Sequence, residues 1–168
     1  DNGFYSYPRY RRAIEEDCQF RCVYCDVAFQ EGGMEGFHLD HFRPQHRFPE
    51  IRNSPFNLVL ACPACNTSKS KDWPDDEISE IGYIDPFEND RRDYFIVEGT
   101  GELRAARIEA EYSIEALKLN RLTRVQLRRR RIISAREKEL YERVLSRVQG
   151  GISQDDAKMI REILSDLI

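Results

Sequence analysis

The chain contains 168 residues, of which 40% are hydrophobic, and this length and composition predict one domain of ordinary size with a buried core. No stretch approaches the roughly 20 apolar residues of a membrane-spanning helix, and no signal-peptide pattern opens the sequence, so we expect a cytoplasmic protein without membrane contact. The net charge of −4 excludes a surface that is basic throughout, as a general nucleic-acid coat would be.

The N-terminal half is predicted to contain short helices and strands. A helix is expected over residues 8–20, and a short strand over residues 37–42. The apolar run at residues 56–61 is expected to be buried and to lead into a helix over residues 66–72. The acidic residues 75–80 then mark a boundary or linker.

The C-terminal half begins with a predicted β-hairpin, whose strands are expected at residues 94–97 and 102–105. The pattern that follows predicts three helices, at about residues 109–119, 123–148 and 154–167. Charge is unevenly distributed, because residues 75–100 carry nine acidic and two basic side chains, whereas residues 101–148 carry seven acidic and thirteen basic ones. We expect the basic part to meet phosphate, and the acidic part to stay in solvent or face a protein partner.

Four of the five cysteines form two CxxC pairs. These cysteines are Cys22, Cys25, Cys62 and Cys65. Two such pairs supply the four thiolates of a closed tetrahedral zinc site, which has no open position for chemistry and is therefore structural. Metal ligation in a reducing compartment explains the odd number of cysteines better than a disulfide framework does. Cys18, the fifth cysteine, is predicted to be a core thiol on a helix face.

The segment around the second pair contains ligands of another kind. Asp40 and His41 are adjacent, Asn57 follows, and Asn66 comes directly after Cys65. Carboxylate and carboxamide oxygens suit a hard divalent cation, and a neutral imidazole can accept a proton from water at neutral pH. One thiolate site for folding and one oxygen-ligand site for reaction together predict a metal-dependent nuclease.

These residues resemble the HNH endonuclease family. The resemblance rests on Asp40-His41, Pro44, Asn57-Leu58 and the run CPACNTSK at residues 62–69, and it covers roughly residues 22–73. It implies an α+β protein with a zinc-bound ββα-metal (HNH) core followed by a β-hairpin and a helical C-terminal region. The predicted division places the zinc-bound nuclease core with its N-terminal helix in residues 1–74. The acidic linker, the hairpin and the C-terminal helices then occupy residues 75–168.

The resemblance also implies roles for individual residues. His41 would be the general base, and Asp40 and Asn66 would hold Mg²⁺ or another divalent cation. Asn57 would hold the loop and orient the His41 ring through a hydrogen bond. Magnesium keeps water and substrate phosphate in its other positions, so two protein ligands are enough.

Four basic residues are predicted to contact the nucleic-acid backbone. Arg43 and Lys69 flank the predicted site, and Arg128 and Arg131 belong to a run of four arginines. Successive residues on a helix turn by about 100°, so only one or two of that run can meet phosphate. Pairing with acidic side chains is the alternative for the others.

The C-terminal half carries a second resemblance. The segment DPF at residues 85–87, a hairpin around Gly101 and the run SIEALKLNR at residues 113–121 precede an arginine-rich helix. This order is similar to the tail of prokaryotic HNH proteins encoded beside ATPases, among them the Septu-type and retron-associated defence nucleases. It implies a co-encoded ATPase partner and an anti-phage role.

The predicted function is therefore hydrolysis of DNA phosphodiester bonds. A non-catalytic zinc module that binds nucleic acid or a protein is one alternative, although such a module has no reason to keep Asp40, His41 and Asn66 together. An RNA-directed nuclease toxin is another, because a one-metal site does not distinguish the sugar.

Overall fold

The computed structural model describes residues 6–32, 36–74, 82–149, 151 and 153–165. The α-helices are α1 (Arg11–Asp17), α2 (Phe29–Gly32), α3 (Pro63–Lys69), α4 (Glu109–Ala116), α5 (Leu122–Gln149) and α6 (Gln154–Ser165). The strands are β1 (His38–His41), β2 (Leu58–Ala61), β3 (Phe95–Val97) and β4 (Leu103–Ala105). Short 3₁₀ turns lie at Tyr7–Tyr10, Pro49–Ile51, Pro55–Asn57 and Arg91–Asp93. This mixture of helices and small sheets confirms the α+β class.

The first sheet and the helix after it form the centre of the molecule. Strands β1 and β2 are antiparallel, with Asp40 opposite Val59 and His41 opposite Leu58. All four residues of β2 are buried, as its apolar sequence predicts. Helix α3 follows β2 and packs against β1. The order strand, strand, helix therefore places α3 beside the strand that carries Asp40.

Both N-terminal helix predictions misplaced a boundary. The helix expected to end at residue 20 ends at Asp17, because Gln19 and Phe20 adopt left-handed backbone angles (φ 53° and 55°). The amide of Phe20 then donates to the carbonyl of Glu15, which closes the helix and turns the chain toward the first cysteine pair. Helix α3 begins at Pro63 rather than at residue 66, since proline at the first helical position gives up no hydrogen bond.

The second hairpin packs on the beginning of α5. Strands β3 and β4 pair antiparallel and are joined by a turn that ends at Gly101. Gly101 has φ +90°, and a Cβ atom there would lie 2.3 Å from the carbonyl oxygen of Val125. Only glycine allows the hairpin to approach the helix this closely.

The two predicted halves of the chain share one hydrophobic core. Its buried members include Phe42 and Leu60 from the first half and Leu103, Leu119 and Leu127 from the second. The hairpin, α4 and the start of α5 are therefore part of the same folded body as the first sheet. The acidic linker predicted at residues 75–80 lies outside the described residues.

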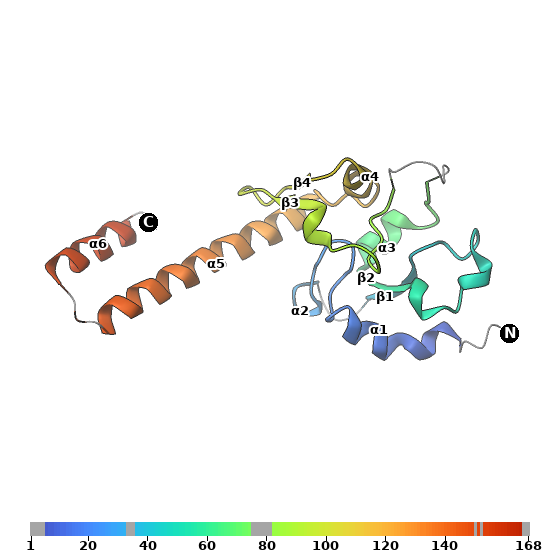
Figure 1. Ribbon diagram of the computed structural model, residues 1–168, viewed down its shortest axis with the longest axis horizontal. Coiled ribbons are helices and arrows are strands. Elements are labelled where there is room, and N and C mark those ends of the chain that lie inside the picture. The colour runs from blue at the N-terminus through green and yellow to red at the C-terminus, as the bar shows by residue number, and fades with distance from the viewer. Residues whose placement is uncertain (1–5, 33–35, 75–81, 150, 152, 166–168) are drawn as a thin grey trace.

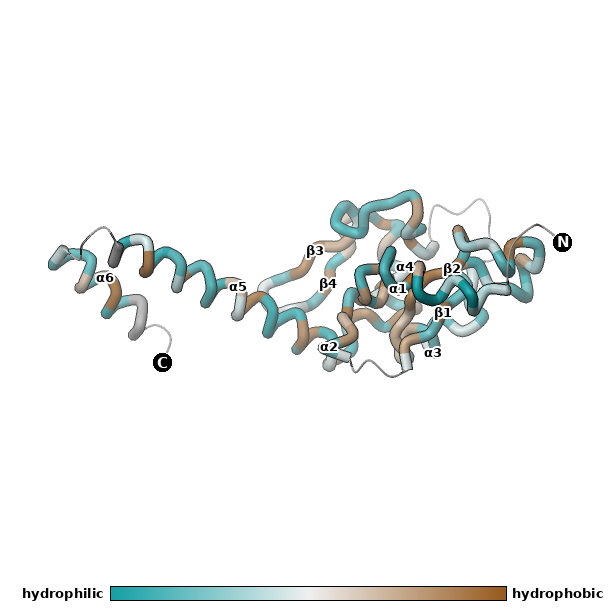
Figure 2. The backbone as a smooth tube through the Cα atoms, turned by 90° about the horizontal axis from the view of Figure 1, so that it is seen from below, coloured by the Kyte–Doolittle hydropathy of each residue, from teal (hydrophilic) through white to brown (hydrophobic). Residues whose placement is uncertain are grey.

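Helix α5 begins in this body and leaves it as an arm (Figure 1). The arm, defined as α5 from Ile133 onward together with α6, points away from the end where the N-terminus lies. Its surface is mostly hydrophilic (Figure 2), although Ile133, Tyr141 and Leu145 are exposed. In the part of the chain that the structure describes, no helix is both long and apolar enough to span a membrane.

Candidate functional site

The four paired cysteines meet in one buried cluster. Their Sγ atoms all lie within 4.8 Å of one another, and each side chain is buried. The Sγ atoms of Cys25 and Cys62 are 3.6 Å apart. Zinc–sulfur bonds of about 2.3 Å in a tetrahedral site place two sulfurs about 3.8 Å apart, so this cluster fits a zinc ion. The predicted ligand set is therefore brought together by the fold.

Two turns hold these thiols. In the first knuckle (residues 22–27), the amide of Cys22 donates to the carbonyl of Val27 and the amide of Asp26 donates to the carbonyl of Cys22. In the second knuckle (residues 62–65), the chain enters α3, whose first turn brings Cys65 beside Cys62. Burial raises the pKa of Cys22, whereas a hydrogen bond from Cys22 lowers the pKa of Cys25 to about 6.

His41 lies at the end of β1 and its ring has a defined hydrogen-bond partner. Its Nε2 is 2.9 Å from the backbone carbonyl oxygen of Arg52, and the Tyr7 and His41 rings pack in a T shape with their centroids 5.0 Å apart. A carbonyl oxygen can only accept, so Nε2 carries the proton and Nδ1 carries the lone pair. Burial lowers the pKa of His41 below its ordinary value, which favours the neutral ring at neutral pH.

Asp40 is buried next to a cation and a phenol. Its Oδ2 accepts a hydrogen bond from Tyr24 Oη at 2.6 Å and lies 3.3 Å from Lys69 Nζ. Burial raises the pKa of this carboxyl, and the Lys69 ammonium partly offsets that effect. Both contacts fix the orientation of the carboxylate through one of its oxygens.

Asn57 holds the chain that follows His41. Its Oδ1 accepts from the amide of Arg43 at 2.8 Å, and its Nδ2 donates to the carbonyl of Arg43 at 3.0 Å. Both bonds go to the backbone of one residue, and the side chain is buried. The predicted hydrogen bond from Asn57 to the His41 ring is not found among the described residues, and the ring pairs through Nε2 with the carbonyl of Arg52 instead.

Lys69 has an internal role that the sequence prediction missed. Its side chain is 0% exposed, and its Nζ donates to the carbonyl of His41 at 2.9 Å in addition to its contact with Asp40. The prediction that Lys69 contacts phosphate is corrected, because no surface reaches this buried ammonium. Asn66 is half-buried and lies three residues before Lys69 on α3, so the two side chains are neighbours on the helix surface.

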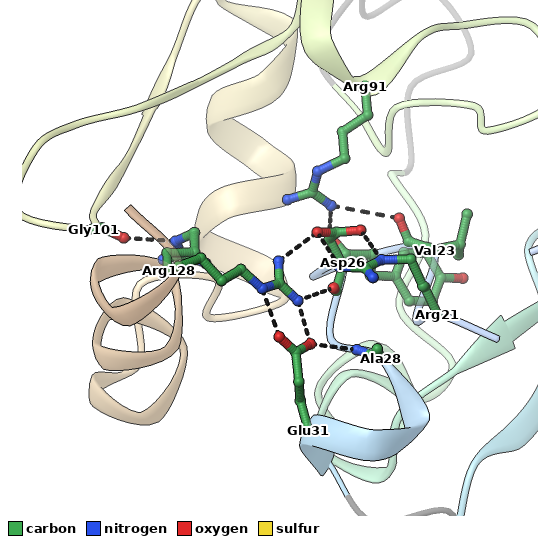
Figure 3. A network of polar contacts seen from close by, with 10 residues as sticks. Arg21, Val23, Asp26, Ala28, Glu31, Arg91, Gly101 and Arg128 are labelled. Carbon is green, nitrogen blue, oxygen red and sulfur yellow. Dashed lines mark hydrogen bonds and ion pairs between the residues drawn. The ribbon is translucent and has the colours of Figure 1, made fainter. Parts of the chain in front are cut away.

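The other predicted DNA contacts are also engaged inside the protein. Arg128 is 5% exposed and donates to the carbonyls of Gly101 (2.6 Å) and Leu119 (2.9 Å), so its predicted DNA contact is wrong. Arg131 pairs with Asp26 (2.6 Å) and with Glu31, in the network that Figure 3 shows. Arg43, which is partly exposed, lies 3.2 Å from the Asp85 carboxylate. The run of arginines is therefore used mainly by internal partners at its two ends.

Three contributors to these sites were not predicted. They are Tyr24, the carbonyl of Arg52, and Arg121, whose Nη2 lies 3.3 Å from Cys65 Sγ. Tyr24 lies inside the first CxxC pair and Arg121 ends the run SIEALKLNR, so both stood in segments already singled out. Arg52 contributes a backbone atom, for which the residue type gives no signal.

One comparison finds a match over the segment that contains the first sheet and the knuckles. Residues 22–72 match the family model of HNH endonucleases. The matched segment contains both cysteine pairs and the four residues Asp40, His41, Asn57 and Asn66. No curated protein and no solved structure matches the chain. An HNH domain indicates a nuclease, and it accounts for less than a third of the chain.

Proposed function

We propose that the protein is a metal-dependent HNH endonuclease that hydrolyses phosphodiester bonds in DNA. The observation that carries this proposal is the contact between His41 Nε2 and the Arg52 carbonyl. It leaves the Nδ1 lone pair of a neutral ring free to take a proton from water.

Asp40 and Asn66 would hold the reactive metal ion. Both known contacts of the Asp40 carboxylate use Oδ2, so Oδ1 is the oxygen that a cation would take. Asn66 would add its side-chain carbonyl from α3, which packs against β1. This donor set of one carboxylate and one carboxamide fits Mg²⁺, which prefers oxygen ligands and retains water. When bound, a divalent cation supplies charge neutralisation at the attacked phosphate and at the leaving 3′ oxygen.

The remaining residues keep these groups in position. Tyr24 orients the Asp40 carboxylate, and Asn57 fixes the backbone immediately after His41. Lys69 ties the end of β1 to α3 through the carbonyl of His41. Positioning matters here because a misplacement of about 1 Å can cost roughly 100-fold in rate.

DNA would be bound by exposed basic side chains. Arg129 and Arg130 are the exposed members of the arginine run, and the partly exposed Arg43 lies close to the His41 loop. The net charge of −4 makes the isolated chain a weak binder of DNA, because lysine and arginine contacts to phosphate supply most non-specific affinity. A partner that delivers DNA fits this charge.

We also propose that the partner is a co-encoded ATPase, that the complex acts against phage in the cytoplasm, and that the arm makes the protein contact. The support is the resemblance of the C-terminal half and the exposed apolar side chains of α5, namely Ile133, Tyr141 and Leu145. Weak cleavage by the isolated chain and strong cleavage in the complex are the expected results. Full cleavage by the chain alone would leave a stand-alone nuclease.

The test is a cleavage assay with plasmid, linear DNA and RNA, with Mg²⁺ or with EDTA, and with or without the neighbouring ATPase. We expect DNA cleavage that requires the divalent cation and that His41→Ala removes. His46→Ala is the matched control, since His46 is an exposed histidine in the following loop. Equal cutting by the two variants would refute the proposal, and cleavage of RNA alone would identify an RNA-directed nuclease instead.

A further inference from the structure

Two arginines from the start of α5 stand against the cysteine cluster. Arg121 Nη2 lies 3.3 Å from Cys65 Sγ, 3.6 Å from Cys25 Sγ and 3.7 Å from Cys62 Sγ. Arg124 Nη2 lies 3.7 Å from Cys62 Sγ. These are N–H···S contacts, and one nitrogen of Arg121 reaches three of the four sulfurs.

Neither guanidinium has an acidic partner among the described residues. Both Nε atoms are buried and donate to no group in the described part of the chain. Arg121 Nη1 donates only to the carbonyls of Leu117 and Lys118, which carry no formal charge. Two half-buried cations without a counter-ion would be costly, so an anion has to face them.

The metal-loaded cysteines supply that anion. A zinc ion bound by four thiolates carries two net negative charges, and the two guanidiniums carry two positive charges. If the four cysteines were neutral thiols, the same place would hold two uncompensated cations. The arginines and the tetrathiolate therefore need each other electrostatically.

Two further arginines hold the first knuckle from the same side. Arg91 donates to the carbonyls of Tyr24 and Val23, and Arg131 donates to the carboxylate and to the carbonyl of Asp26 (Figure 3). Both come from the second half of the chain, as Arg121 and Arg124 do. The first knuckle is therefore one of the places where the C-terminal half attaches to the HNH domain.

We propose that Arg121 and Arg124 neutralise the zinc tetrathiolate and thereby make attachment of the hairpin and α5 depend on the metal. In this role they are positioning residues of the zinc centre. The zinc ion then does more than join two knuckles, because it also holds the start of α5, from which the arm extends. This proposal does not involve DNA cleavage, so it stands or fails separately from the proposed nuclease function.

The first experiment measures metal binding by the full chain. Arg121→Gln should weaken zinc binding by about 10–100-fold in competition with a chromophoric chelator, the size expected when a partner of a metal ligand is removed. It should also shift the sulfur-to-metal charge-transfer bands of the cobalt-substituted protein, because an N–H···S contact is lost. The zinc affinity of Arg121→Lys should lie between those of the parent protein and Arg121→Gln, because lysine keeps the positive charge but not the planar guanidinium group. Arg130→Gln removes an exposed arginine of the same helix and should change neither quantity.

The second experiment measures attachment by hydrogen exchange with zinc in excess. In Arg121→Gln, amides of β3, β4 and the first turns of α5 should exchange faster, while α6 at the tip of the arm should be unchanged. If the variant fails to fold, Arg124→Gln decides, because Arg124 approaches a single sulfur. Zinc affinity and cobalt spectrum unchanged from those of Arg130→Gln would overturn the proposal, and a weakened affinity would support it.

Discussion

The two ends of α5 use the same amino acid in opposite ways. At its root, Arg124 and Arg128 turn inward to sulfur and to backbone carbonyls, and Arg131 pairs with Asp26. Further along, Arg136 and Arg143 are exposed on the arm. The difference lies in what faces the helix, since the start of α5 meets the buried sulfurs and Asp26 of the knuckles and the carbonyls of Gly101 and Leu119. An arginine-rich helix is therefore no proof of a DNA-binding surface, because three of the eight arginines of α5 contact partners inside the protein.

The HNH domain and the start of α5 should be far more sensitive to metal loss than the arm. We expect Cys62→Ser, or prolonged chelation, to unfold the HNH domain, because structural zinc sites contribute about 10–16 kcal/mol to folding. The purified protein should contain about one zinc ion per chain by elemental analysis, and circular dichroism should report the unfolding. A folded, zinc-free protein would contradict the assignment of the four cysteines.

The catalytic prediction tests whether His41 contributes to the reaction or to the stability of the HNH domain. His41→Ala should reduce cleavage by about 10²–10⁴-fold, as loss of a general base commonly does. Zinc content and thermal unfolding should stay close to those of the parent protein, because the ring hydrogen bond to the Arg52 carbonyl is one contact among many. A parallel loss of zinc would show that His41 acts through the fold instead.

Within the arginine run, burial should decide the cost of substitution. Arg128→Ala leaves the carbonyls of Gly101 and Leu119 without their buried donor, so we expect a loss of about 1–3 kcal/mol in the free energy of unfolding. Arg130→Ala, at an exposed position, should change it by no more than about 0.5 kcal/mol. Urea unfolding measures the free energy of unfolding of both variants. Equal losses would contradict the division of the arginine run into buried and exposed members.

The hairpin turn offers a smaller test of the same packing. Gly101→Ala should destabilise the protein by roughly 1 kcal/mol or more, because φ is +90° and the new Cβ would collide with the Val125 carbonyl. Gly99→Ala is the control, since nothing lies within 4 Å of a Cβ built there. Thermal unfolding distinguishes them, and a neutral Gly101→Ala would show that the hairpin can lift from α5 at no cost.

Removal of α6 should have the least effect on the zinc site and the proposed catalytic site. A chain that lacks residues 150–168 should keep its zinc and its basal cleavage, because the described part of α6 makes no hydrogen bond or ion pair to either site. Its binding to the co-encoded ATPase should weaken, as measured by co-purification. Unchanged partner binding would move the proposed contact to the body of the protein.

The sequence predicted the parts of the site that depend on residue type and spacing. Two CxxC pairs and an adjacent Asp40-His41 pair are distinctive; the fold brings the four cysteines together, and Asp40 and His41 end β1. The prediction failed where position in space decides. Lys69 is a surface base by composition but becomes buried because α3 packs on β1, and Arg121 meets sulfurs that lie 56 and 96 residues away in the chain.

Helix ends were the other failure, and their cause is local. Residues 18–20 suit a helix by composition, yet the first knuckle requires the chain to reverse there, and two left-handed residues accomplish this. The residue types of Gln19 and Phe20 do not indicate a left-handed backbone conformation, whereas glycine or asparagine would have suggested one. The tautomer of His41 was equally hidden, since it depends on a peptide carbonyl.

The length of α5 sets the distance between the knuckles and α6. Its 28 residues extend for about 42 Å at about 1.5 Å per residue. That length equals about twelve base pairs of duplex DNA at about 3.4 Å each. A protein seated on α6 would therefore stand a little more than one turn of the double helix from the knuckles. Shortening α5 by two turns would bring the two about 11 Å closer without altering either surface.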